Sequence, residues 1–379
     1  MRAMKPGSPA IRSLAAGVGS LVRIALPFAI LAGATAREIR LTPVFVIQSE
    51  TVMNTPEDIK IEGHRMFVSL RGSPREGDQR QRLQAGISAW DLQQIGAPKL
   101  LFHFSHPALQ GGMDHVLSGR TLFLQSLYNA TLLSLDLTEV SAPVLLGTLK
   151  LGGAQAVAYR LFEIRDQRRL VVSVRDEPTQ PTGRIAVIDI ADPRHLRVAV
   201  ALTEPGAWSY DNHAVQNAVY SFPYKQGNGK LSIYELGRDD HFRLHGTLVD
   251  PLLDGVHCHE DNGHLFVANF NTASILVLDI RDRFAPRIVG RLQDHRLEKP
   301  TRIAPDRERN LLWVAGFGNT ISVIDIANRQ APRFAGSFTH PQFDQVQTIA
   351  YYQDHLFVGS RNSHSTVILR VEVAEAARP

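Results

Sequence analysis

The stretch VLDIRDRFAPRIVG occupies residues 277–290, and the related stretch VIDIANRQAP occupies residues 323–332. In both, two apolar residues precede an acid, and the proline of an Ala-Pro pair stands seven residues after that acid. An apolar pair before an acid, or a close variant of it, occurs six times, with the acids 44 to 53 residues apart at Asp91, Asp136, Asp189, Glu235, Asp279 and Asp325. The proline of an Ala-Pro pair follows in four of these copies, at Pro98, Pro143, Pro286 and Pro332. A unit of this length that recurs along a chain is typical of repeat folds.

A second apolar run precedes each acid within its repeat. It occurs seven times, at residues 66–68, 122–124, 170–172, 219–221, 265–267, 312–314 and 356–358. Each repeat holds four short β-type runs divided by Gly, Asn, Asp and Pro, and no segment between them shows helical periodicity. Four strands in about 45 residues predict an all-β fold, a seven-bladed β-propeller of four-stranded antiparallel blades.

The two ends of the repeat region complement each other. Residues 42–47 resemble the outer strand of a blade, yet no inner strands precede them. The last repeat has inner strands up to Val371 and no outer strand after them. We therefore expect the N-terminal strand to close the last blade beside residues 367–371, which protects both sheet edges. Residues 37–379 are predicted to form this single domain.

Residues 1–36 predict a secretory signal peptide. Four bases and no acid lie in this segment, residues 24–36 are uncharged, and Ala34-Thr35-Ala36 ends it with small residues. The apolar run is shorter than the ~20 residues that span a bilayer. An uncleaved anchor is the alternative. We expect export to a periplasmic or extracellular location, with no transmembrane span in the mature chain.

The charge of the chain is concentrated in the same segment. The sequence has 41 Lys and Arg and 37 Asp and Glu residues, and the four bases of the first 36 residues account for the difference. A balanced mature domain gives no reason to expect nucleic acid as a partner. The single cysteine, Cys258, forms no internal disulfide, so stability must come from packing.

The repeated runs VIDIADP, VLDIRDRFAP, VIDIANRQAP and SLDLTEVSAP resemble the LVIVD-repeat family of extracytoplasmic β-propellers. The resemblance covers nearly the whole mature chain. It implies a propeller fold and export, and it implies little about chemistry.

Loop length points to one face of the predicted ring. The loops between second and third strands and the linkers between blades share a face, and several are long. Polar residues gather on the same side, where the innermost strands begin, and we expect them to line a central funnel that binds a ligand. These candidates are Asp58, Asp114, His115, Gln155, Asp211, Asn212, His213, His257, Arg302 and Gln347. The simpler interpretation is a water-filled channel with polar strand ends.

The segment from Gly255 to Glu260 suggests a metal site. In a strand, His257 and His259 share one face while Cys258 points to the other. With His115, His213 or a nearby Asp they offer ligands for a divalent ion of Zn, Cu or Fe. The alternative is histidines satisfied by backbone and water. No nucleophile elbow, phosphate-binding loop or dinucleotide fingerprint occurs.

The leading functional hypothesis is an exported propeller that binds a small molecule or a protein through its loop-rich polar face. The alternative is a propeller enzyme, a metal-dependent hydrolase or oxidoreductase, with its site in the central funnel. The sequence identifies neither the ligand nor a cofactor.

Overall fold

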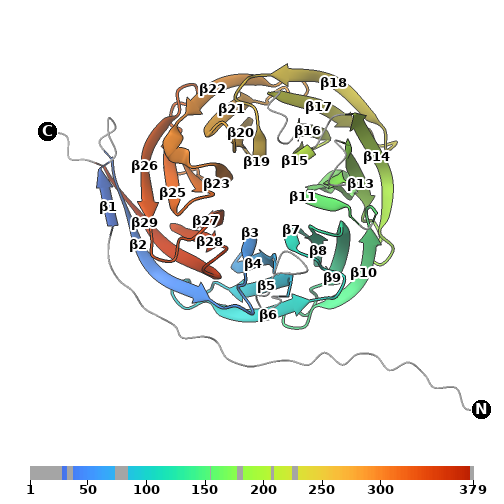
Figure 1. Ribbon diagram of the computed structural model, residues 1–379, viewed down its shortest axis with the longest axis horizontal. Coiled ribbons are helices and arrows are strands. Elements are labelled where there is room, and N and C mark those ends of the chain that lie inside the picture. Colours follow the sequence, from blue (N-terminus) through green and yellow to red (C-terminus); the bar gives the residue numbers. More distant parts are fainter. Residues whose placement is uncertain are drawn as a thin grey trace, which may run out of the picture.

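The computed structural model describes residues 28–31, 37–72, 84–153, 155–176, 182–205, 209–223 and 229–375. These residues form seven antiparallel sheets arranged as blades in a ring (Figure 1). The seven-bladed β-propeller is confirmed. Most of the predicted signal segment and of the long loop after residue 72 lies outside the described residues, as does the side chain of Asp211.

Each blade is ordered from the channel outward. Blade 1 comprises β3 (Pro56–Glu62), β4 (Arg65–Leu70), β5 (Gly86–Asp91) and β6 (Lys99–Ser105). Blade 2 comprises β7 (Gly112–Ser118), β8 (Thr121–Ser126), β9 (Thr131–Asp136) and β10 (Val144–Lys150). Blade 3 comprises β11 (Val157–Ile164), β12 (Arg169–Arg175), β13 (Thr182–Asp189) and β14 (Arg197–Pro205). Blade 4 comprises β15 (Ser209–Val215), β16 (Ala218–Pro223), β17 (Lys230–Leu236) and β18 (Phe242–Val249).

The remaining blades follow the same order. Blade 5 comprises β19 (Gly255–Asp261), β20 (His264–Asn269), β21 (Ser274–Asp279) and β22 (Arg287–Gln293). Blade 6 comprises β23 (Pro300–Asp306), β24 (Leu311–Gly316), β25 (Thr320–Asp325) and β26 (Arg333–Thr339). Blade 7 comprises β27 (Val346–Tyr352), β28 (His355–Ser360), β29 (Ser365–Glu375) and β2 (Arg37–Gln48). Two short 3₁₀ turns, η1 (Arg165–Gln167) and η2 (His295–Leu297), complete the described elements, which include no α-helix.

The ring closes through its chain ends, as predicted. Strand β2 pairs antiparallel with β29, with Thr42 opposite Arg370 and Val46 opposite Val367. Blade 7 differs from the prediction in one respect, because β1 (Phe28–Leu31) pairs with the outer edge of β2 and adds a fifth strand (Figure 1). No helix in the described part of the chain is long and apolar enough to cross a bilayer.

The repeated motif has a local cause. The side chain of Asp279 accepts a hydrogen bond from the backbone N–H of Arg281 at 3.1 Å, and Asp325 accepts from that of Ala327 at 2.9 Å. An acid that binds the backbone two residues on shapes the turn from the third to the fourth strand. Further along, a Cβ on Gly290 would lie 2.0 Å from the carbonyl oxygen of Arg329, so glycine lets blade 6 approach blade 5.

Bulges at the start of the innermost strands matter most for function. In six blades the second residue of this strand is skipped in the pairing with the next strand. These skipped residues are Glu57, Met113, Tyr210, Val256, Thr301 and Gln347. In β11 the skip is larger and contains Arg160. A bulge turns a side chain away from the regular alternation of the strand, and here all bulges lie at one mouth of the channel.

Candidate ligand-binding site at the mouth of the ring

A cavity of about 190 Å³ opens at this mouth. It is lined by residues from blades 1, 3, 5, 6 and 7, namely Arg71, Arg160, Val256, Phe270, Thr301, Arg302, Phe317, Gln347 and Arg361. Four of the nine are arginines, and two of these, Arg160 and Arg302, are 1% and 2% exposed.

Two repeated backbone positions supply most of this lining. The first is the bulge, which provides Arg160, Val256, Thr301 and Gln347. The second is the first residue after the second strand of a blade, which provides Arg71, Phe270, Phe317 and Arg361. The ring brings these equivalent positions together, so that the chemistry of the cavity depends on which residue type each blade places there.

Glu57 holds one side of the cavity in place. It is fully buried, and both of its carboxylate oxygens accept hydrogen bonds from Arg361, at 2.6 to 3.0 Å. The side-chain amide of Gln347 donates to the same carboxylate at 3.2 Å, and Arg71 lies 3.9 Å away. The side-chain oxygen of Gln347, Oε1, is buried and has no hydrogen-bond partner among the described residues.

A chain of ion pairs continues around the channel. Arg302 binds Asp58 at 3.2 Å, and the ammonium of Lys60 lies 3.4 Å from Asp58 and 2.5 Å from Asp114. Burial works to raise the pKa of Asp58, but Lys60, His115 and Arg160 outweigh it and hold that pKa below its ordinary value. Burial likewise works to lower the pKa of Lys60, and the neighbouring carboxylates outweigh it and raise that pKa. Both groups are therefore charged at neutral pH.

Positive charge exceeds negative charge in this network. Its bases are Lys60, Arg71, Arg160, Arg302 and Arg361, and its described acids are Glu57, Asp58 and Asp114. Such an excess in a recessed cavity attracts an anion, and guanidinium groups bind carboxylates and phosphates with paired hydrogen bonds.

The predicted metal ligands are divided between two places. His115 lies with Asp58 and Asp114 in a buried group whose ligand atoms are within 4.8 Å of one another, and no second group of this kind occurs among the described residues. Lys60 already places its positive charge between the two carboxylates, so a metal ion would have to displace it. His115 bonds to the Ser69 hydroxyl at 2.7 Å, and burial with Lys60 nearby lowers its pKa to about 4.

The other three histidines lie on blades 4 and 5. Burial, with some repulsion from His259, lowers the pKa of His213 to about 3. Burial and the nearby Arg307 lower the pKa of His259 to about 4. The pKa of His257 is lowered by burial, Arg160 and the two other histidines, and its Nδ1 accepts from the backbone N–H of Ile303 at 3.3 Å. This wall of the channel is therefore uncharged at neutral pH, and a metal ion there stays a prediction.

The remaining candidates have separate surroundings. Asn212 is buried and donates to the Ser173 hydroxyl at 2.7 Å. Gln155 is exposed in the turn before β11 and does not line the cavity. Asp211 belongs to β15 by its backbone.

Sequence reasoning missed several lining residues. It selected Arg302 and Gln347, but Arg160, Phe270 and Phe317 were not among its candidates. Phe270 and Phe317 share one repeat position, directly after the second strand, with Arg71 and Arg361. Alignment of the repeats at that position is the signal that would have found the two phenylalanines.

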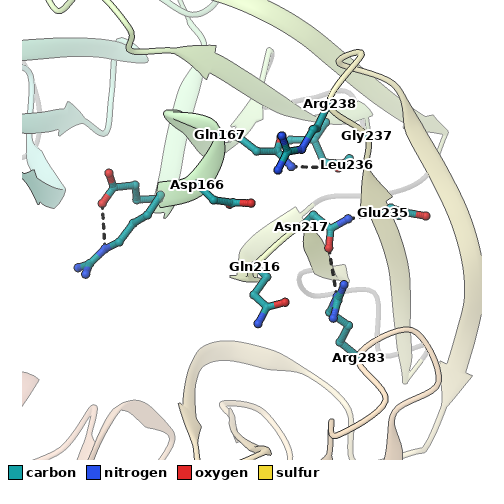
Figure 2. Close-up of a pocket in the computed structure, with 11 residues that line it drawn as sticks. Asp166, Gln167, Gln216, Asn217, Glu235, Leu236, Gly237, Arg238 and Arg283 are labelled. Atoms are coloured by element: carbon teal, nitrogen blue, oxygen red, sulfur yellow. Dashed lines mark hydrogen bonds and ion pairs between the residues drawn. The ribbon is translucent and has the colours of Figure 1, made fainter.

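A larger depression of about 760 Å³ lies on the opposite face, between the turns of blades 3, 4 and 5 (Figure 2). Several of its polar side chains contact one another. Glu163 pairs with Arg165 at 3.3 Å. Asn217 donates to Glu235 at 3.2 Å and accepts from Arg283 at 3.1 Å, and Figure 2 shows these three side chains together. We place the candidate site at the smaller cavity, because two of its arginines, Arg160 and Arg302, are almost fully buried.

The fold and the cavity define a seven-bladed β-propeller with an arginine-lined mouth. No family model and no curated protein matches the chain.

Solved structures share the fold at low sequence identity. The β-propeller domain of Cps50 (Swd1) from Myceliophteria thermophila superposes with a TM-score of 0.66 at 10% identity, covering 88% of this chain and 100% of that one. Raptor from Chaetomium thermophilum gives 0.64 at 13% identity over 89% of this chain, which spans only 29% of Raptor. A putative 6-phosphogluconolactonase from Bacteroides fragilis gives 0.64 at 12% identity, covering 86% and 97% of the two chains. At these identities the likeness is one of fold alone.

Proposed function

We propose that the protein is an exported β-propeller that binds a small anionic ligand in the mouth cavity. The observation that carries this proposal is the convergence of four arginines, two of them almost fully buried, on one cavity. Buried charges are costly unless they are matched, and the excess of bases favours a negatively charged occupant. The cavity is smaller than the roughly 300–1,000 Å³ of pockets for drug-sized molecules, which favours a small ligand.

Removal of one rim arginine tests this function. Arg71→Met retains most of the apolar stem and removes the charge, while Arg329→Met removes an arginine of similar exposure that pairs with Asp261 away from the cavity. We expect acetate, phosphate or benzoate to bind the mature protein at one site by calorimetry. Arg71→Met should weaken that binding about tenfold, because a hydrogen bond to a charged group contributes about 1.5–3 kcal/mol.

The control variant, Arg329→Met, should bind as the parent does. If none of the three anions binds, or if both variants bind them like the parent, the anion-binding function is wrong.

We also propose that the chain is exported and belongs to the LVIVD-repeat propellers. Cleavage after Ala36 would remove β1 and leave β2, which begins at Arg37 and by itself pairs with β29. Closure of the ring is therefore compatible with loss of the signal. N-terminal sequencing of protein recovered outside the cytoplasm should begin at Arg37, and a chain retained whole in the cytoplasm would contradict export.

A metal-dependent enzyme is the second candidate, and the group of Asp58, Asp114 and His115 is the observation that favours it. Metal analysis of the purified mature protein decides this point. Stoichiometric metal that is lost in an Asp58→Asn, His115→Gln double variant supports the enzyme, whereas metal-free protein argues for Lys60 as the resident cation.

A further inference from the structure

The mouth cavity has two chemically different walls. Arg71, Arg302, Arg361 and the amide of Gln347 form a polar wall from blades 1, 6 and 7. Phe270 and Phe317, with Val256, form an apolar wall from blades 5 and 6. The two phenyl rings lie edge to face with their centroids 5.8 Å apart, an arrangement that aromatic rings favour.

The apolar wall is held by neighbouring cations. The guanidinium of Arg361 lies 5.5 Å from the centre of the Phe317 ring, and the ammonium of Lys299 lies 5.6 Å from that of Phe270. Cations over aromatic faces stabilise such contacts by about 0.5–1 kcal/mol when exposed. Arg361 is itself held by Glu57 through both carboxylate oxygens, so we expect its guanidinium to keep its position when the Phe317 ring is removed.

The size of the cavity selects among anions. A protein cavity of about 150 Å³ is sufficient for benzene. At about 190 Å³, this cavity therefore accommodates one six-membered ring and a carboxylate, and it is too small for a nucleotide. A bare inorganic anion would leave the phenylalanine wall in contact with water.

The side-chain amide of Gln347 indicates that the ligand carries a hydrogen-bond donor. Gln347 is 2% exposed and directs its amide nitrogen to Glu57, which fixes the orientation of the amide. Gln347 lines the cavity, and its Oε1 thereby stays an acceptor for which the described part of the chain offers no hydrogen-bond partner. Buried acceptors are nearly always paired, so a ligand with a hydroxyl or amino donor would satisfy it.

We propose that the ligand is a small aromatic carboxylate that carries a hydrogen-bond donor on its ring, because arginines, a buried amide acceptor and two phenylalanine rings line the same cavity. This inference rests on the anion-binding function proposed above and specifies its ligand class. The carboxylate binds the arginines, the ring packs against Phe270 and Phe317, and the ring substituent donates to Gln347.

Calorimetry with matched probes tests the class. The probes are the three hydroxybenzoate isomers, benzoate, acetate and phenol, titrated into the mature protein. We expect benzoate to bind on the order of tenfold or more tighter than acetate, because its ring removes apolar surface from water. At least one hydroxybenzoate should bind tighter than benzoate, and phenol, which lacks the charge, should not bind measurably.

Two variants assign these preferences to the cavity. Phe317→Leu removes one ring of the apolar wall and should weaken benzoate binding by about threefold or more, while acetate binding is unchanged. Gln347→Leu should abolish the advantage of hydroxybenzoate over benzoate. The matched control is Phe334→Leu, since Phe334 also lies under an arginine, Arg296 at 3.9 Å, on the outer strand β26 away from the cavity.

The outcomes separate the two proposals. If acetate binds as tightly as benzoate, or if Phe317→Leu weakens both equally, the aromatic ligand class is wrong and anion binding stands. If neither acetate nor any benzoate binds, the ligand class and the anion-binding function fail together. Loss of benzoate binding in Phe334→Leu equal to that in Phe317→Leu would also overturn the assignment to this cavity.

Discussion

The Glu57 carboxylate both stabilises the ring and competes with an incoming anion for the same guanidinium groups. It is fully buried and binds Arg361 through both oxygens, so Glu57→Gln keeps the shape of the side chain and removes its charge. Breaking a buried ion pair costs about 3–5 kcal/mol. The remaining amide oxygen still accepts one bond, so we expect a loss near the lower limit, about 3 kcal/mol. At ~2 °C per kcal/mol for a large domain, Tm should fall by roughly 6 °C.

The same substitution should strengthen anion binding. Without the Glu57 charge, the bases of the network outnumber its acids further, and Arg361 becomes available to a ligand. One unit charge at cavity distances amounts to about 1–3 kcal/mol at an effective dielectric constant of 20. We therefore expect benzoate to bind about tenfold tighter to Glu57→Gln than to the parent.

Urea unfolding and calorimetry measure the two effects separately. Asp261→Asn is the matched control, because Asp261 is also buried and binds two arginines, Arg307 and Arg329, outside the cavity. It should lose stability without any change in benzoate affinity. A Glu57→Gln protein that is destabilised and binds benzoate no better than the parent would refute the competition between the carboxylate and the ligand.

Three further predictions concern the channel and the ring. The folded pKa of His115 is about 4, below the ordinary value of 6.5, so the unfolded chain takes up this proton first. The contribution of neutral His115 to the free energy of unfolding is therefore fully present above pH 6.5 and is lost between pH 6.5 and pH 4, at about 1.4 kcal/mol per pH unit. In urea unfolding, His115→Asn should reduce the dependence of this free energy on pH by about the same slope. In Lys60→Met, the free energy of unfolding should fall by about 3 kcal/mol, and Zn²⁺ should raise the Tm of the variant but not that of the parent. A rise in Tm with Zn²⁺ in the parent alone would contradict the role of Lys60. Leu41 lies in the closing strand β2, and Leu41→Ala should lower the free energy of unfolding in urea by about 2–4 kcal/mol. The exposed control Val144→Ala should lower it by less than about 0.5 kcal/mol. Equal losses in the two variants would argue against closure through β2.

The fold was predictable because its signals are local and recur. Each repeated acid shapes a turn by binding a backbone N–H two residues away, as Asp279 and Asp325 do, so the pattern appears directly in the sequence. Closure was predictable for a related reason. In the repeat pattern, residues 42–47 form an outer strand without inner strands, and residues 367–371 belong to a blade without an outer strand. The two segments are therefore expected to pair with each other, as they do.

The site was predictable only in part because bulges break the alternation on which strand reasoning depends. The search for polar residues at the start of the innermost strands correctly selected Arg302 in β23 and Gln347 in β27, and both line the cavity. Arg160 lies in the irregular segment of β11, where two residues fall out of register, so a period of two does not show which way it faces. Sequence reasoning selected the exposed Gln155 instead of Arg160, because Gln155 is near the predicted start of this strand.

The bulges also explain how a ring of near-identical blades acquires an asymmetric site. A skipped residue leaves the ladder on either side intact, so its side chain is free of the core packing that fixes the residues around it. At this one position blade 5 places Val256, blade 6 Thr301, blade 7 Gln347 and blade 1 Glu57. Over these four blades polarity rises from blade 5 to blade 1, whereas blade 2 places Met113 and the larger irregularity of blade 3 places Arg160. Because each blade presents different chemistry at the same backbone position, an anion with one apolar side meets different partners in each orientation, which a symmetric ring would not impose.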